Sequence, residues 1–139
     1  MQYLLDTNVF IKWINNDYSI LSPEQLAILS NPQNTLFIST ATMHEMAVKV
    51  RKGNLEMSVP FADAISSERK KFNIQLLPVK EEHYLHIILI PQVKLKASST
   101  KIHADPFDLL IIAQSMIENV SVLSTDAYFP DYEGLEVVS

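Results

Sequence analysis

The chain has 139 residues, 47% of them hydrophobic, with 2 glycines, no cysteine and a formal net charge of −5. This length and composition fit a single globular domain over residues 1–139 and exclude a fibrous or disordered protein. The lack of cysteine excludes disulfides and thiolate metal sites, and the negative charge argues against a protein that coats nucleic acid through lysine and arginine. Because the N-terminus has no signal-peptide pattern and no apolar run could cross a bilayer, we expect a cytoplasmic protein without a membrane partner.

Five short apolar runs are predicted as strands, and the segments between them mostly as helices. In chain order, the strands are Tyr3–Leu5, Leu36–Ile38, Ile74–Leu77, Val122–Ser124 and Leu135–Val138. The helices are predicted from about Val9, from Pro23 with Ser22 as cap, from Thr40 or Thr42 to Gly53, over Pro60–Lys71, from about Glu81, and over Pro106–Asn119. Between the last two helices, Pro91–His103 is predicted as a loop with room for a helical piece.

Apolar strands that alternate with helices predict an α/β fold with a mostly parallel sheet of four to five strands, flanked by helices on both faces. In such sheets, ligand sites lie at the carboxyl ends of the strands. Asp6 directly follows the first strand and Asp126 follows the fourth. The sequence therefore predicts both carboxylates at the functional edge of the sheet.

Three of the acidic side chains have two interpretations on local sequence alone. Asp6 can cap the helix that follows it or bind a metal ion, and a capping oxygen is less free to bind a cation. Glu45 can form an exposed pair with Lys49, four residues later, or lie at the rim of a cleft, because its helix is apolar around much of its circumference. Asp126 can be a turn residue or a ligand.

The segment DPFD begins the clearest predicted helix. Asp105 suits the N-cap, Pro106 the first helical position, and Asp108 the third, where an acid also favours the positive end of the helix dipole. Capping accounts for Asp105 but leaves Asp108 unexplained, and the next residues are strongly apolar. We therefore expect this helix start to be buried and its carboxylates to line a pocket.

The sequence contains none of the common histidine, phosphate-loop or nucleophile motifs. His83 and His86 lie three residues apart and could share a metal ion, but a position on a helix surface is favoured. There is no HExxH spacing, no glycine-rich phosphate loop and no GxSxG.

Four segments, in order along the chain, resemble the PIN domain family, and within it the VapC-type toxins of bacterial toxin–antitoxin pairs: YLLDTNVFI, ISTATMHEMAVKVRKGNLE, DPFDLLIIAQSM and VLSTDAYF. The resemblance implies a PIN-like three-layer fold and an endoribonuclease that depends on Mg²⁺ or Mn²⁺. It assigns the acidic quartet, both catalytic and metal-binding, to Asp6, Glu45, Asp108 and Asp126. Such a set would hold a cation, which would activate a water for attack on an RNA phosphodiester bond.

The resemblance also implies partners and supporting residues. An antitoxin protein and a second copy of the chain are the expected protein partners, and Phe10, Trp13 and Met43 could contact the antitoxin, although packing in the core is the favoured role for them. Possible supporting residues are Thr7, Asn8, Ser124, Thr125 and Asp105, the last either as cap or as outer support. Possible RNA-backbone contacts are Lys49, Arg51 and Lys52, which can equally form an ordinary solvated helix end.

Two positions depart from the family pattern, since Leu109 stands where close relatives often have Arg, and His44 where many have Trp. Two alternative functions are a catalytically inactive PIN-like module that binds proteins, and a metal-dependent phosphatase. The intact acidic set weighs against the first alternative. The absence of a DxD pair and of a phosphate loop weighs against the second.

Overall fold

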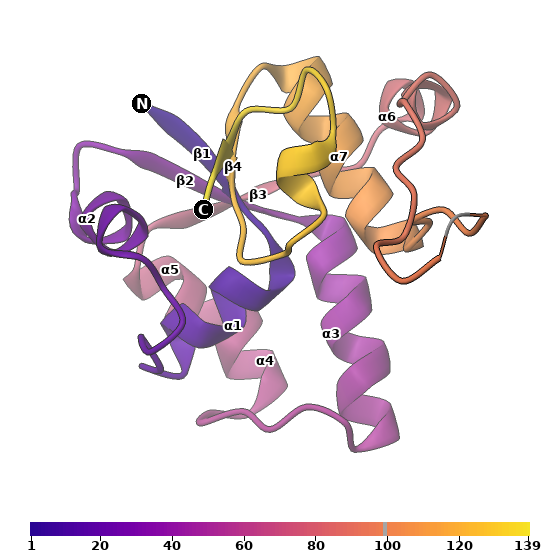
Figure 1. Ribbon diagram of the computed structural model, residues 1–139. Helices are drawn as coiled ribbons and strands as arrows, with labels where there is room; N and C mark the ends of the chain where they lie inside the picture. The colour runs from indigo at the N-terminus through magenta and orange to yellow at the C-terminus, as the bar shows by residue number, and fades with distance from the viewer. Residues whose placement is uncertain (99) are drawn as a thin grey trace.

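The computed structural model describes residues 1–98 and 100–139 and contains five short strands in one sheet (Figure 1). The strands are β1 (Gln2–Leu5), β2 (Thr35–Ser39), β3 (Ile74–Leu77), β4 (Ser121–Leu123) and β5 (Val137–Val138). Their order across the sheet is β3-β2-β1-β4-β5, and every neighbouring pair is parallel. The predicted α/β fold with a parallel sheet is therefore confirmed, with five strands.

Helices fill the connections between the strands. They are α1 (Thr7–Ile14), α2 (Pro23–Ser30), α3 (Thr40–Lys52), α4 (Phe61–Asp63), the π-helical η1 (Ala64–Glu68), α5 (Arg69–Lys71), α6 (Glu81–Ile87), α7 (Pro106–Glu118) and the 3-10 turn η2 (Phe129–Asp131). The helix predicted over Pro60–Lys71 is present, but a π-helical turn interrupts it. None of the described helices combines the length and hydropathy of a bilayer span.

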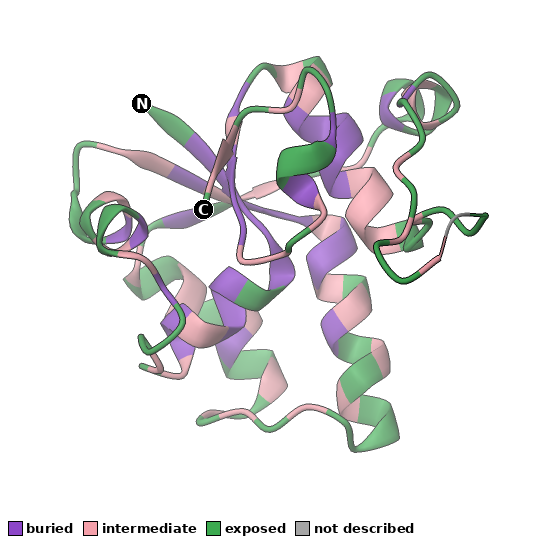
Figure 2. Ribbon diagram, in the orientation of Figure 1, coloured by how far each residue is buried: buried purple, intermediate pink, exposed green. Residues whose placement is uncertain are grey.

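Two apolar clusters cover the two faces of the sheet, as the alternation of side chains along β1 requires. Tyr3 and Leu5 belong to the cluster that includes Phe10 of α1, whereas Leu4 belongs to the cluster that includes Ile112 of α7. Burial is concentrated along the strands, α1 and the half of α3 nearest the sheet, while the far end of α3 is exposed (Figure 2). This arrangement gives the three layers that the sequence predicts.

The chain reverses direction across the sheet at β1. It adds β2 and β3 on one side of β1, and then returns to add β4 and β5 on the other side. Leu5 at the end of β1 is opposite Leu123 at the end of β4. A crevice outside the carboxyl ends of strands at such a switch point is the usual ligand site of open α/β sheets.

Gln25 ties α2 to the ends of the last two strands. It forms a capping box with Ser22, in which Gln25 N donates to Ser22 Oγ at 3.1 Å and Ser22 N donates to Gln25 Oε1 at 3.0 Å. The buried Gln25 Nε2 donates to the carbonyl oxygens of Ser124 and Val138 at 3.0 and 2.9 Å. The helix start predicted at Ser22 and Pro23 is confirmed, and its first turn also fixes the backbone after β4.

The segment Pro91–His103 is a loop closed by an antiparallel bridge between Lys94 and Ile102. Leu95 N donates to Lys101 O at 2.8 Å, and His103 N donates to Val93 O at 2.7 Å. These bonds satisfy the backbone across the loop, and the described part of the segment contains no helix. Within this predicted loop, Ser99 lies outside the described residues.

His83 is buried, so the favoured position of this histidine on a helix surface is wrong. Its Nδ1 accepts from the backbone N–H of Lys80 at 2.9 Å, so Nε2 carries the hydrogen and donates to Glu118 Oε1 at 2.9 Å. One imidazole therefore caps α6 and links α6 to α7. Periodicity alone could not reveal this role, because it depends on a partner 35 residues away.

We expect His83→Ala to lower the free energy of unfolding by about 2–4 kcal/mol, because it removes both bonds and leaves a cavity. Chemical denaturation monitored by circular dichroism measures the change. His86→Ala, on the same helix and less buried, is the matched control and should cost less than about 1 kcal/mol. Equal losses in the two variants would contradict the linking role of His83.

Candidate functional site

Asp6 lies at the junction of β1 and α1, and both of its carboxylate oxygens accept hydrogen bonds. Oδ1 accepts from Val9 N at 2.8 Å, which makes Asp6 the N-cap of α1. Oδ2 accepts from the hydroxyl of Ser124, just after β4. The capping interpretation is therefore confirmed, and the bond to Ser124 ties the ends of the two neighbouring strands.

The turn after β4 holds Asp126 beside Asp6. Ser124 Oγ, which donates to Asp6, also accepts from the backbone N–H of Asp126 at 3.0 Å. Asp126 Oδ1 accepts from the backbone N–H of Tyr128 at 2.7 Å, so Asp126 is also a turn residue. Asn8 Nδ2 donates to Thr125 Oγ1 at 2.9 Å and joins the same turn to α1.

Asp105 and Asp108, at the start of α7, have different roles. Asp105 Oδ1 accepts from the backbone N–H groups of Phe107 and Asp108 at 3.0 and 2.9 Å, so Asp105 is the N-cap, as predicted. Asp108 is turned inward, and its side chain is 21% exposed. The cap thus fixes the backbone from which the Asp108 carboxylate projects.

Glu45 approaches from α3. Its Oε2 pairs with Lys49 Nζ at 3.0 Å, so the predicted i,i+4 pair is present, but the Glu45 side chain is only 12% exposed, so the prediction of an exposed Glu45 is wrong. Its Oε1 is buried and has no hydrogen-bond partner among the residues that the structure describes. A buried carboxylate oxygen without a partner lowers the stability of the fold. A ligand from outside the chain could supply the missing partner.

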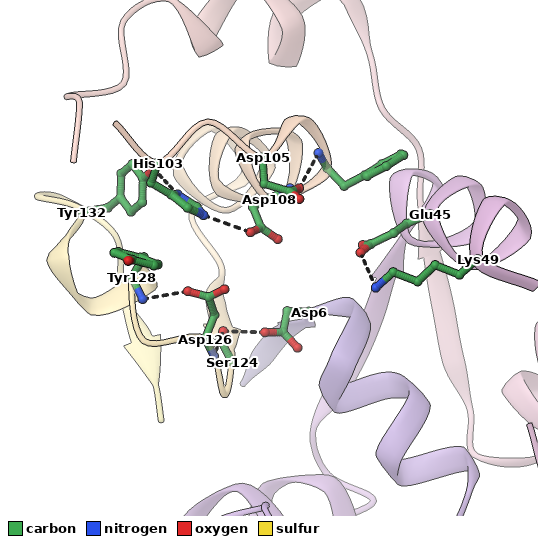
Figure 3. Close-up of polar contacts among 11 residues, drawn as sticks. Asp6, Glu45, Lys49, His103, Asp105, Asp108, Ser124, Asp126, Tyr128 and Tyr132 are labelled. Atoms are coloured by element: carbon green, nitrogen blue, oxygen red, sulfur yellow. Dashed lines mark hydrogen bonds and ion pairs between the residues drawn. The ribbon is translucent and has the colours of Figure 1, made fainter. Parts of the chain in front are cut away.

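These carboxylates face one space at the switch point of the sheet (Figure 3). Asp6, Asp126 and Asp108 surround it on one side and Glu45 points toward it from α3. One oxygen of Asp108, one oxygen of Asp126 and a ring nitrogen of His103 all lie within 4.8 Å of one another. Among the described residues, neither Asp6 nor Glu45 belongs to a group of three possible ligand atoms that are this close to one another.

Burial, with neighbouring negative charge, raises the pKa of two of the acids. Burial, and then the charge of Asp105, raise the pKa of Asp108 from 3.8 to about 8, and Asp126, Glu45 and Asp6 add to the effect in that order. Burial also raises the pKa of Asp6 to about 6, although its hydrogen bonds with Ser124 and Val9 oppose the shift. Burial and then the charge of Asp108 raise the pKa of Tyr132 to about 12.

His103 is the site residue that sequence reasoning missed. Its Nε2 lies 3.2 Å from Asp108 Oδ2, and its Nδ1 lies 2.6 Å from Tyr132 Oη. Its ring stacks on Tyr128 at a centroid distance of 4.9 Å. No spacing rule could have found it, because the loop that brings it to α7 follows no periodic pattern.

The remaining candidate residues lie around this space in different ways. Thr7 bonds to Thr42 inside the protein, with 3.0 Å between their Oγ1 atoms. Lys49 and Lys52 line a groove beside Glu45, together with Asn54 and Phe107. Arg51, Leu109 and His44 do not line this groove.

The three residues suggested for antitoxin contacts have the favoured core role. Phe10 and Trp13 are buried in the cluster on the α1 face, and Met43 packs against that cluster. Only the expectation of core packing is therefore confirmed for them. Met43 is only partly buried, whereas Phe10 and Trp13 are buried and offer little surface to a partner.

The donor set suits a hard divalent cation. Mg²⁺ and Mn²⁺ both accept carboxylate oxygens, and a bound cation would favour the ionised forms of Asp108 and Asp6, which burial and neighbouring negative charge disfavour. Glu45 Oε1 supplies an independent sign, since it is buried without a partner among the described residues. The cluster could therefore bind such an ion.

Comparison with known proteins gives one family and several related folds. A family model for the PIN domain matches residues 3–135. No curated protein matches the chain. The chain resembles the solved structure of VapBC2 from Rickettsia felis bound to a promoter DNA fragment, with a TM-score of 0.67 and 18% identity over 99% of this chain and 98% of that one. It also resembles DNA-bound VapBC from Salmonella typhimurium, with a TM-score of 0.63 and 17% identity over 99% of this chain and 97% of that one. A third similar structure is VapBC-1 from nontypeable Haemophilus influenzae, with a TM-score of 0.61 and 21% identity over 100% of this chain and 98% of that one. At these identities, the likeness establishes the fold.

The raised pKa of Asp108 predicts that the metal-free protein loses stability as pH rises. Between pH 3.8 and about 8, the folded chain binds this proton and the unfolded chain does not, so the free energy of unfolding falls with pH. From pH 6.5 to 8.5 in EDTA we expect a fall of roughly 1–2 kcal/mol in the parent and a flatter profile in Asp108→Asn. Denaturant titrations at each pH measure it.

Two features sharpen this measurement. Above pH 6.5 the Asp6 carboxyl, with a pKa of about 6, is largely ionised, so Asp6 contributes little to the slope in this range, and the comparison with Asp108→Asn identifies the share of Asp108. Asp131→Asn, at an exposed position of η2, is the control and should keep the parental profile. A profile in Asp108→Asn as steep as that of the parent would contradict the assignment.

Proposed function

This chain belongs to the PIN domain family, and we propose that it is a metal-dependent endoribonuclease, the VapC-type toxin of a toxin–antitoxin pair. One observation carries the proposal: carboxylates from β1, α3, α7 and the turn after β4 face one space at the switch point of the sheet. Buried acids that raise one another's pKa are a poor way to stabilise a fold, and a common feature of functional sites.

In this proposal Asp6, Glu45, Asp108 and Asp126 hold Mg²⁺ or Mn²⁺. A bound ion supplies positive charge that offsets the charge of the scissile phosphate, and it lowers the pKa of a water. The protein supplies orientation: Ser124 and the backbone of Val9 fix Asp6, and Tyr128 fixes Asp126. Asp105 acts indirectly, because it caps the helix that carries Asp108.

The RNA is proposed to cross the groove beside Glu45. Lys49 and Lys52 line this groove and can meet backbone phosphates, while Phe107 offers an aromatic surface for a base. Arg51 is exposed on the same helix and would add charge farther along the strand. The groove also contains the carboxylates of Glu45 and Asp105, so in this proposal the lysines meet phosphates while a bound metal ion offsets the acids.

The proposed protein partners follow from the solved structures that the chain resembles. These are structures of VapBC, and two of them include DNA. We propose that this chain likewise pairs with an antitoxin protein. We also propose that two copies form a homodimer, as the family resemblance implies. Co-purification with the product of the neighbouring reading frame tests the first of these pairings directly.

We expect Asp108→Asn and Asp126→Asn each to lower Mg²⁺- or Mn²⁺-dependent RNA cleavage by roughly 100-fold or more, because a bound ion supplies several kcal/mol of transition-state stabilisation. Cleavage of labelled single-stranded RNA on denaturing gels measures the rate. Asp131→Asn should retain parental activity, and circular dichroism checks that each variant is folded. Unchanged cleavage in the two site variants, or in excess EDTA, would refute the nuclease assignment.

We expect Lys52→Ala to weaken RNA binding and to reduce its salt dependence. A single-stranded phosphate contact contributes about 0.7 to the slope of log K against log salt, so the slope should fall by about that amount. Fluorescence anisotropy with the Asp108→Asn protein as background measures binding without cleavage. Lys70→Ala, exposed on α5, is the control; an equal change in both variants would argue against a path along this groove.

A further inference from the structure

The imidazole of His103 is held in one orientation by two tyrosines. Tyr128 stacks on the ring, with planes 17° apart, and the Tyr132 ring meets it edge-on at 5.7 Å. The Tyr132 hydroxyl lies 2.6 Å from Nδ1. The side chain is only 8% exposed, so little space is left for another orientation.

This orientation directs Nε2 toward the carboxylates (Figure 3). Nε2 lies 3.2 Å from Asp108 Oδ2, and a ring nitrogen of His103 is within 4.8 Å of oxygens of both Asp108 and Asp126. Adjacent ligand atoms on an octahedral ion with bonds of about 2.1 Å are roughly 3 Å apart. The spacing of Nε2 and Oδ2 is therefore that of two neighbouring ligands on one ion, as well as that of a hydrogen bond.

We propose that His103 Nε2 is a nitrogen ligand beside Asp108 and Asp126 and makes the site select a first-row transition-metal dication over Mg²⁺. The inference deepens the proposed function and rests on its metal site. Magnesium favours an all-oxygen shell, whereas Mn²⁺, a first-row transition-metal ion, accepts an imidazole nitrogen beside carboxylate oxygens more readily, so an exchange of one oxygen for nitrogen changes the ratio of the two affinities.

The proposal requires one tautomer of His103. Nε2 must keep its lone pair, so Nδ1 carries the hydrogen and donates to the Tyr132 oxygen. Metal-bound histidines commonly donate their second ring nitrogen to a polar partner in this way, which fixes the tautomer and the ring. Tyr132 is suited to accept, since its hydroxyl oxygen has lone pairs and lies at hydrogen-bonding distance.

A competing role for His103 is that of a hydrogen-bond donor that only orients Asp108. The two roles differ in what the loss of His103 does to two ions. Loss of an orienting bond would weaken Mn²⁺ and Mg²⁺ binding by a similar factor, because both ions use the Asp108 oxygen. Loss of a nitrogen ligand would weaken Mn²⁺ binding selectively.

Calorimetric titration of the full chain with Mn²⁺ and with Mg²⁺, without RNA, tests the proposal. His103→Phe keeps a flat ring beside Tyr128 and removes both nitrogens. We expect its Mn²⁺ affinity to fall about tenfold or more, and its Mg²⁺ affinity to change less than about threefold. His44→Phe is the matched control at the rim of the site, where His44 meets Phe107 edge-on at 5.3 Å, and it should leave both affinities unchanged.

Pulsed electron paramagnetic resonance of the Mn²⁺-loaded parent gives a second readout that needs no variant. Histidine labelled with ¹⁵N should replace a ¹⁴N imidazole coupling by a ¹⁵N coupling, and this coupling should persist in His44→Phe. Absence of the coupling, or equal weakening of both ions in His103→Phe, would overturn the proposal. If His103→Phe binds both ions with the parental ratio of affinities, the histidine-ligand proposal fails and the nuclease proposal stands. If the parent binds neither ion, both proposals are refuted.

Discussion

The parallel pairing of β1 with β4 is the constraint on which the site depends. It sets Leu5 opposite Leu123, so the next residues of both strands emerge side by side. The Ser124 hydroxyl can then reach Asp6, and the turn after β4 can hold Asp126. A slip of one residue would turn the Asp6 side chain to the other face of the sheet and separate these groups. The chemistry of the site is thus specified by strand register before any helix contributes.

Helices α3 and α7 bring carboxylates toward this edge at an electrostatic cost. Ordinary packing would keep Asp108 apart from the acids around it, yet the backbone cap by Asp105 and the apolar burial of Ile111 and Ile112 fix the helix there. The favourable burial of α7 offsets the repulsion. The Lys49 pair with one oxygen of Glu45 relieves only part of the negative charge. This arrangement lowers stability, and the cluster could bind a cation that offsets the loss.

Local pattern was enough to predict the strands, the caps at Ser22 and Asp105, and Asp6 and Asp126 at one sheet edge, because each depends on neighbours in sequence or on the general geometry of parallel sheets. The structure brings Glu45 and Asp108 to the same space, but their chemical roles came only from family resemblance. His103 and His83 could not be predicted. Each owes its position to a partner on another element, Tyr128 in one case and Glu118 in the other, and neither interaction leaves a periodic trace.

The two-residue strand β5 helps to hold the backbone that carries the site. Gln25 Nε2 bridges the carbonyls of Ser124 and Val138, and the Ser22 hydroxyl donates to the carbonyl of Ser139 at 2.9 Å. The last residues of the sequence are therefore fastened to the same helical turn that supports the backbone beside Asp6. A protease cut in this strand would release these bonds and loosen the backbone beside the carboxylates.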